Sequence, residues 1–207
     1  MPVITGVCEG HRGRAKVFVD GEFWAELDAN VAVECAIFVG AVLSDEELVW
    51  ARVAGEKPLA INRALHLLGY RARSEDELCE RLLRAGYAAQ TIDEVLRRLE
   101  KLGYLDDEAF ARELARSGAR KRYGPRRVFG DLRRAGVGDE VARGVVEDEF
   151  AGRSEHEEAL EVAQQRYNTG EGSDAQARRV YGFLMRRGYS ASVCAEIAQS
   201  YRRGTDE

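Results

Sequence analysis

The sequence predicts a mainly α-helical protein, in which tandem three-helix repeats form an elongated curved array after a small N-terminal β-hairpin and helix. Three observations predict this fold class. Leucine and glycine recur with one fixed spacing, Ser-x-x-Glu patterns precede the segments between them, and similar segments return after about fifty residues. Charged residues make up 32% of the chain, which suits helices with wide solvated faces.

Residues 1–57 are expected to form the hairpin and one helix. Asp20-Gly21 lies between two runs rich in β-branched and aromatic residues, a pattern typical of a hairpin turn. The spacing Ser44-x-x-Glu47 is that of a capping box, and it predicts a helix that ends at Gly55. We expect residues 55–58 to form a linker.

From Pro58 onward, glycines mark the expected helix ends. Each of five glycines follows an amphipathic stretch, has leucine four residues before it and has an apolar or aromatic residue after it. This pattern is typical of a helix that ends with glycine in the left-handed conformation at C′ and the next side chain packed back onto the helix. These glycines are Gly69, Gly86, Gly103, Gly136 and Gly188.

The expected helix starts are marked by capping residues. Ser or Thr followed three residues later by Glu or Gln occurs at Ser74, Thr91, Ser154 and Ser173. Gly124-Pro125 places a proline at a first helical position. Between these starts and stops the apolar residues recur with helical spacing.

The glycine corners expose the repeat. The segments that end at Gly86, Gly136 and Gly188 stand 50 and 52 residues apart, and each is expected to be the second helix of a three-helix unit. A repeat of this period is typical of solenoid-like arrays. The expected units comprise residues 58–105, 106–152 and 153–207.

The residues show no recognisable catalytic pattern. The glycines end helices instead of forming a phosphate-binding loop, and the three histidines have no nucleophile partner. Carboxylates gather in first helical turns, where the helix dipole accounts for them. The four cysteines include no C-x-x-C pair, so we expect reduced, mostly buried thiols. We therefore predict a binding protein without enzymatic activity, cofactor or metal.

The chain also shows no sign of a membrane segment. It has no run of about eighteen apolar residues, and its N-terminus has no basic region followed by an apolar run. We therefore expect a cytoplasmic protein.

The positive charge is concentrated in one block. The whole chain has a net charge of −5, whereas residues 109–136 carry +7 and residues 137–165 carry −7. Arginine, which outnumbers lysine eight to one in the block, offers a planar fork suited to carboxylate or phosphate. The candidate partner-binding residues are Arg112, Arg116, Arg120, Lys121, Arg122, Tyr123, Arg126, Arg127, Arg133 and Arg134.

Two interpretations of this block are open. It is either a solvated surface, balanced by the acidic helix that follows, or a binding site. Two features favour a site: Arg112, Arg116 and Arg120 line one helix face, and a free helix N-terminus behind Pro125 forms an anion-receiving corner beside Tyr123.

Three segments resemble the RecX family: Arg81–Tyr87 (RLLRAGY), Leu102–Ala111 (LGYLDDEAFA) and Tyr123–Val128 (YGPRRV). The resemblance covers residues 59–150, extends more loosely to the third unit, and includes the hairpin only as an extension seen in some members. It implies a regulator that binds the RecA recombinase filament in its groove and inhibits strand exchange, ATP hydrolysis and co-protease activity. Such a protein acts in DNA repair, recombination and the SOS response.

Several functional alternatives stay open at this point. The arginine-rich face could meet single-stranded DNA within the filament as well as the recombinase. We expect a monomer. A second hypothesis is an autonomous, helix-turn-helix-like DNA-binding module, although the overall acidity and the acidic segment 137–165 argue against it. A third, an unknown enzyme, has only unassigned carboxylates to support it.

Overall fold

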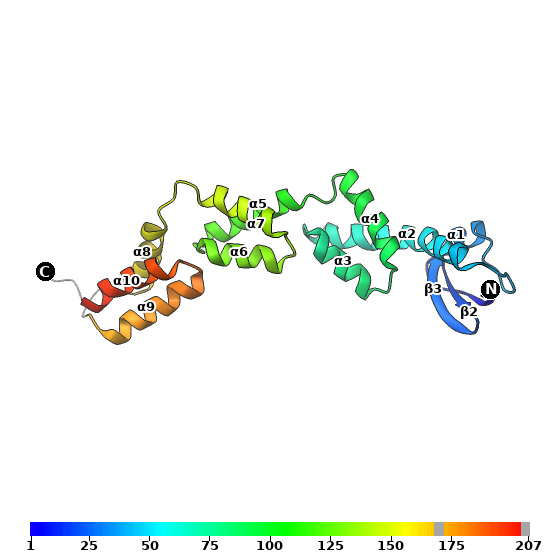
Figure 1. Cartoon of the computed structure of the whole chain (residues 1–207), viewed down its shortest axis with the longest axis horizontal. Helices are drawn as coiled ribbons and strands as arrows, with labels where there is room; N and C mark the ends of the chain where they lie inside the picture. The colour runs from blue at the N-terminus through cyan, green and yellow to red at the C-terminus, as the bar shows by residue number, and fades with distance from the viewer. Residues whose placement is uncertain (168–171, 204–207) are drawn as a thin grey trace. The chain divides into compact units, whose positions relative to one another are not determined.

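The computed structural model describes residues 1–167 and 172–203, and the chain divides into two compact units, Met1–Asp106 and Asp107–Glu207. A three-stranded sheet precedes helices that make up most of the described chain (Figure 1). The expected mainly α-helical class is therefore confirmed. The elongated curved arrangement of the repeats stays a prediction. Among the described residues, no helix is both long and apolar enough to span a membrane.

The N-terminal sheet is antiparallel and has one strand more than the expected hairpin. Its order is β1 (Ile4–Glu9), β2 (Arg14–Val19) and β3 (Glu22–Asp28). The expected turn at Asp20-Gly21 is confirmed, with φ of 48° and 89°. The buried face of the sheet, with Val17 and Leu27 fully enclosed, packs on α1 (Ala29–Glu34) and on the long helix that follows.

Helix α2 runs without interruption from Asp45 to Tyr70, so the linker expected at 55–58 is wrong. Its N-terminus has the expected capping box at Ser44. Gly55 does not end the helix; it lies against β3, where an added Cβ would sit 2.8 Å from the Cβ of Leu27. Pro58 lies inside the helix, where it supplies no amide donor to the backbone hydrogen bonds. Because Gly55 has no side chain, α2 can pack closely against β3 at this point.

Replacing Gly55 with alanine is expected to lower the free energy of unfolding by about 1 kcal/mol, although alanine favours helices, because overpacking costs about 1–3 kcal/mol. Gly69 in the same helix is the control, since a Cβ there meets nothing within 4 Å. Gly69→Ala should be neutral or stabilising. Urea unfolding followed by the fluorescence of Trp24 and Trp50 measures both; equal stability of the two variants would contradict the packing role.

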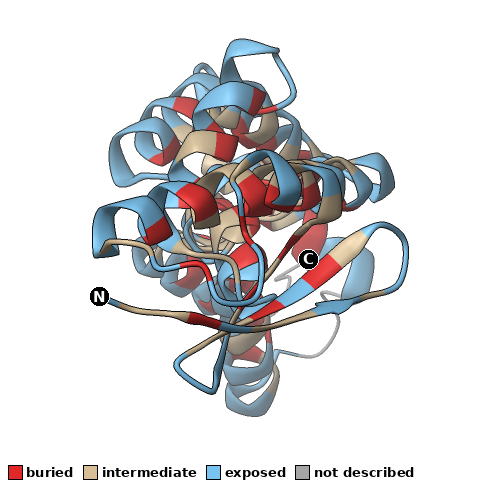
Figure 2. Cartoon of the chain, turned by 90° about the vertical axis from the view of Figure 1, so that its right-hand side faces the viewer, coloured by how far each residue is buried: buried red, intermediate tan, exposed pale blue. Residues whose placement is uncertain are grey.

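The first repeat consists of α2, α3 (Glu75–Arg84) and α4 (Ala89–Lys101) around a core that includes Leu78, Leu82 and Leu99. Buried positions alternate with exposed ones along the helices (Figure 2). This distribution is the one that the helical spacing of apolar residues predicts.

The capping box expected at Thr91 is wrong, because another helix caps α4. Glu56 of α2 is 2% exposed, and its Oε2 accepts hydrogen bonds from the amide of Ala88 and the hydroxyl of Thr91, both at 2.8 Å. Arg52 donates to the other oxygen of Glu56 at 2.7 Å. A carboxylate 32 residues before Ala88 in the sequence thus supplies the hydrogen-bond acceptor at the N-terminus of α4.

Four of the five expected glycine stops are confirmed. Gly86, Gly103, Gly136 and Gly188 have positive φ, and the next amide donates back to the leucine carbonyl of the pattern at 2.9–3.3 Å. Gly69 is the exception, since its φ is not positive and α2 continues through Tyr70. The chain leaves α2 two residues after Gly69, in an extended conformation at Arg71.

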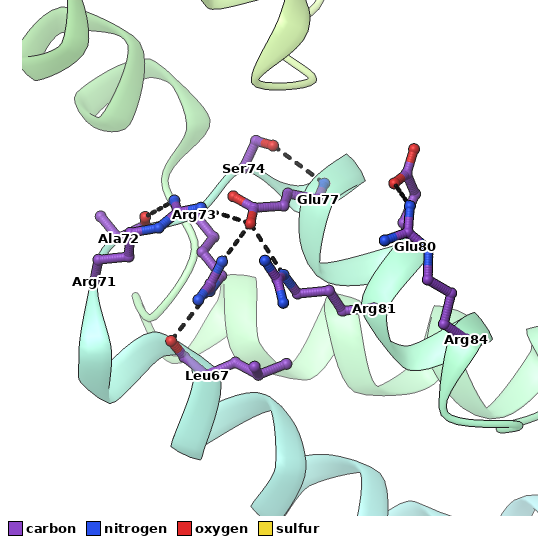
Figure 3. A network of polar contacts seen from close by, with 9 residues as sticks. All are labelled: Leu67, Arg71, Ala72, Arg73, Ser74, Glu77, Glu80, Arg81 and Arg84. Atoms are coloured by element: carbon purple, nitrogen blue, oxygen red, sulfur yellow. Dashed lines mark hydrogen bonds and ion pairs between the residues drawn. The ribbon is translucent and has the colours of Figure 1, made fainter.

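One carboxylate ties α2 to α3 (Figure 3). Glu77 Oε1 accepts hydrogen bonds from Arg71 at 2.6 Å, from Arg81 at 3.0 Å and from Arg73, whose Nε also donates to the carbonyl of Leu67 at 3.1 Å. Burial raises the pKa of Glu77, but hydrogen bonds from Arg81 and Arg71, with the charges of Arg71 and Arg73, outweigh it and hold the pKa below its usual value. The expected serine cap at Ser74 is present.

The second unit holds two further three-helix sets. The first comprises α5 (Asp107–Arg120), α6 (Pro125–Arg134) and α7 (Asp139–Phe150), and the second α8 (Glu155–Arg166), α9 (Asp174–Arg187) and α10 (Ala191–Arg203). The expected serine caps at Ser154 and Ser173 are confirmed. Residues 168–171 and 204–207 of the expected third unit lie outside the described residues.

All four cysteines are free thiols, as expected, but most of them are not fully buried. Only Cys194 is buried, and burial raises its pKa to about 11. Cys35 and Cys79 are half-buried, and Cys8 is exposed near the end of the edge strand β1.

Candidate partner-binding surface

The basic block lies on α5, α6 and their junction. Helix α5 ends with the same hydrogen bond as the helices that stop at glycine, since the amide of Tyr123 donates to the Gly118 carbonyl at 3.1 Å. Arginine takes the place of the glycine here, and Arg122 has a φ of 58°. The left-handed conformation costs a non-glycine residue about 1–2 kcal/mol. No sequence pattern predicts this stop, because the motif is recognised by its glycine. The expected start of α6 at Pro125 is confirmed.

The junction packs against the turn between α9 and α10. The Gly124 amide donates to the carbonyl of Arg187 at 2.8 Å, and the Arg126 amide donates to that of Gly188 at 3.2 Å. An added Cβ on Gly124 would sit 2.5 Å from the Gly188 oxygen, and one on Gly188 would sit 2.3 Å from the Cβ of Arg127. The two glycines thus permit direct backbone contact between the second and third repeats.

This contact corrects the interpretation of the α6 N-terminus as a free anion-receiving corner. The amide of Arg126 already has the Gly188 carbonyl as its acceptor, and the amides of Arg127 and Val128 bond to Gly124. A backbone carbonyl therefore takes the place that an anion was expected to occupy.

Arg187, which the sequence did not single out, completes the junction. Its Nη1 donates to the carbonyls of Lys121 at 2.8 Å and Arg122 at 3.3 Å. The Tyr123 ring centroid lies 3.8 Å from the Arg127 guanidinium carbon and 5.6 Å from that of Arg187, which are cation–π contacts. The fully buried Tyr189 also donates to the Arg122 carbonyl, at 3.1 Å.

The environment of Tyr189 keeps its hydroxyl protonated. Burial, helped by the negative charge of Glu158, raises the pKa of Tyr189 to about 12. The hydroxyl therefore stays a hydrogen-bond donor across the neutral pH range, and the junction does not change with pH through this group.

Most of the candidate arginines form ion pairs within the chain. Arg122 binds Glu161 of α8 at 2.9 Å, and Arg120 binds Glu113 at 2.8 Å. At the two ends of the block, Arg112 pairs with its neighbour Glu108, and Arg133 pairs with Asp139. The candidates with a carboxylate partner are Arg112, Arg120, Arg122, Arg127, Arg133 and Arg134.

Three candidate cations are left for a partner. Arg116 on α5, Lys121 at the junction and Arg126 on α6 are exposed, and their side chains form no ion pair or hydrogen bond with the described part of the chain. Charged groups without an internal partner can bind an anionic surface without first breaking a contact. The structure thus divides the ten candidates into junction residues, locally paired arginines and these three.

Among residues 1–167 and 172–203, no cluster of three or more His, Cys, Asp or Glu side chains is arranged to hold a metal ion.

Comparison with known proteins identifies the repeats. Models of the first, second and third three-helix domains of RecX match residues 60–99, 106–145 and 154–197. The regulatory protein RecX of Bacillus subtilis (strain 168) is 27% identical over 215 residues, which cover 100% of this chain and 80% of that protein. The RecX of Syntrophotalea carbinolica is 34% identical over 139 residues, covering 65% of this chain and 90% of the relative.

Solved structures support the same fold. A crystal structure of regulatory protein RecX aligns with a TM-score of 0.59 at 21% identity, covering 96% of this chain and 100% of that one. The crystal structure of RecX from Lactobacillus salivarius aligns with a TM-score of 0.58, also at 21% identity, over 70% of this chain and 96% of that one. From the three domain matches in their order along the sequence, we conclude that the chain belongs to the RecX family of regulatory proteins.

Proposed function

We propose that this protein is a cytoplasmic monomer that binds the RecA nucleoprotein filament and inhibits its strand exchange, ATP hydrolysis and co-protease activity in DNA repair, recombination and the SOS response. The observation that carries the proposal is the ordered match of all three RecX domains to the helical repeats. A regulator of this kind needs no catalytic group of its own. It acts by occupying the filament groove and hindering the subunit movements that turnover requires.

The proposed contact surface comprises the three cations without an internal partner: Arg116, Lys121 and Arg126. They can pair with carboxylates of the recombinase or with DNA phosphates inside the filament. The paired junction residues have a different role in this proposal. They hold the second and third repeats together, so that the free cations on α5 and α6 are presented from one compact unit.

Charge reversal of these three cations tests the surface. The variant Arg116→Glu, Lys121→Glu, Arg126→Glu should need at least about tenfold more protein for half-inhibition of ATP hydrolysis by RecA on single-stranded DNA, because it removes attractions worth at least about 1.4 kcal/mol. Its fold should persist, since each exposed substitution changes the free energy of unfolding by about 0.5 kcal/mol or less.

The matched control is Arg178→Glu, Arg179→Glu, Arg203→Glu, which makes the same charge change at exposed residues of α9 and α10. Equal loss of inhibition in both variants would show an effect of net charge and would remove the site assignment. If the wild-type protein neither sediments with the filaments nor slows ATP hydrolysis at a near-equimolar ratio, the proposed function is wrong. Salt-dependent binding to duplex DNA without recombinase would favour the autonomous DNA-binding alternative.

A further inference from the structure

The first unit contains a second cationic feature, separate from the surface proposed above. An open cleft of about 680 Å³ lies between the N-terminal sheet and the first repeat. Strands β2 and β3 form one side, and α2 with the turn between α3 and α4 forms the other. Its charged lining residues are Arg14, Lys16, Glu26, Arg52, Glu56 and Arg63.

Some of the charged side chains in this cleft have an ion-pair partner within the described residues, and others have none. Arg14 binds Glu26 at 2.9 Å, and Arg52 binds Glu56 at 2.7 Å, so that both lining carboxylates already hold a guanidinium. Lys16 and Arg63 are exposed, and neither has an ion pair or side-chain hydrogen bond within the described ranges. The cleft therefore offers two uncompensated positive charges, one from the sheet and one from α2, which favours a polyanion.

Aromatic rings lie beside these charges. Phe18 and Phe23 pair across β2 and β3 and meet edge to face, with ring centroids 5.9 Å apart. Phe23 is 57% exposed, so its ring is accessible to a ligand in the cleft. Tyr87, half-buried at the turn after α3, lines the opposite side. Every base has a flat π face that can stack on an aromatic ring, so exposed rings and cations together suit single-stranded nucleic acid. The carboxylate side chains of an acidic peptide could pair with the cations but could not stack on the rings.

We propose that the cleft between the N-terminal sheet and the first repeat binds single-stranded nucleic acid, with Lys16 and Arg63 contacting phosphates and Phe23 stacking on a base. The proposal does not require the inhibitory surface on α5 and α6, because all residues of the cleft belong to the first unit. It assigns a ligand to the N-terminal sheet, which lies outside the three matched domains.

Fluorescence anisotropy with a labelled dT oligonucleotide, the full chain and no recombinase tests the proposal. Lys16→Glu, Arg63→Glu should weaken binding at least about tenfold. Because two phosphates are no longer neutralised, the negative slope of log affinity against log salt should become shallower by about 1.4. Phe23→Ala should weaken binding about tenfold, because it removes the stacking ring. An abasic oligonucleotide of the same length should bind more weakly to wild type but should be insensitive to Phe23→Ala.

Two control variants separate this cleft from other cationic surfaces. Arg98→Glu, Lys101→Glu makes the same charge change on exposed residues of α4 outside the cleft and should retain wild-type affinity. Arg178→Glu, Arg179→Glu makes the same charge change on exposed residues of α9 and should also retain wild-type affinity. No binding by wild type, unchanged binding by Lys16→Glu, Arg63→Glu, or competition by polyglutamate as strong as by oligonucleotide would each overturn the proposal.

Discussion

Replacing Gly188 with alanine is expected to destabilise the second unit by about 4 kcal/mol, from two causes that act together. Gly188 has a φ of +90°, a conformation that strains any side chain. Its added Cβ would also lie 2.3 Å from the Cβ and 2.4 Å from the amide nitrogen of Arg127. Neither the backbone nor a Cβ can move away as the end of a flexible side chain can. Hydrogen exchange of amides in residues 107–203 of the full chain measures this loss.

Two other glycines of the same unit separate the causes. Gly152 has a φ of +71°, and an added Cβ there meets nothing within 4 Å, so Gly152→Ala should show the conformational cost alone, about 1–2 kcal/mol. Gly182 lies inside α9, where an added Cβ meets only the end of the Arg186 side chain at 3.3 Å. Gly182→Ala should not destabilise the unit. If Gly188→Ala costs no more than Gly152→Ala, the close contact between repeats does not have the proposed importance.

Replacing Glu77 with glutamine is expected to lower the free energy of unfolding of the first unit by about 3 kcal/mol, because three guanidinium groups lose the one charge that they share. The Glu77 side chain is only 20% exposed and that of Arg73 is 7% exposed, so water replaces little of the interaction between these two, whereas Arg71 and Arg81 are 52% and 42% exposed and contribute less. Glutamine also has an NH₂ group where glutamate has its second oxygen, so an N–H donor would face the N–H donors of the arginines. Urea unfolding followed by tryptophan fluorescence reports the change, since both tryptophans lie in this unit.

The pH dependence of this effect has a definite sign. Since the pKa of Glu77 is lower in the folded protein than its usual 4.5, its contribution is complete above that value and is lost as pH falls through the folded pKa. The stability difference between wild type and Glu77→Gln should therefore shrink in acid. Glu80→Gln is the matched control: its exposed pair with Arg84 should contribute less than about 1 kcal/mol at any pH. A difference that stays constant through the acid range would contradict the assigned role of the charge.

The sequence predicted those features of the fold that depend on a few neighbouring residues. The stops at Gly86, Gly103 and Gly136 and the serine caps follow from local hydrogen bonds, and the structure has them. The errors at Gly55 and Thr91 share one cause, because their partners, Leu27 and Glu56, lie 28 and 35 residues away in sequence. No local pattern reports such contacts.

The candidate site was predictable only as a concentration of charge. The sequence located the basic block, but the pairing of its arginines depends on carboxylates brought from other elements, as Arg122 and Glu161 show. Arg187 was missed because nothing in its neighbourhood distinguishes it from any arginine in a last helical turn. The three free cations could therefore be recognised only once the internal pairs were known.

The start of the second helix in each repeat bears on how freely the repeats could be exchanged. Serine stands there in the first and third repeats, at Ser74 and Ser173, and each supplies its own hydroxyl as acceptor. The second repeat has Gly124 instead and obtains an acceptor from the Gly188 carbonyl of its neighbour. A chimaera that moved the second repeat to the C-terminal position would leave that helix uncapped. The second repeat thus needs the third repeat after it to cap its second helix, and the three repeats are not interchangeable modules.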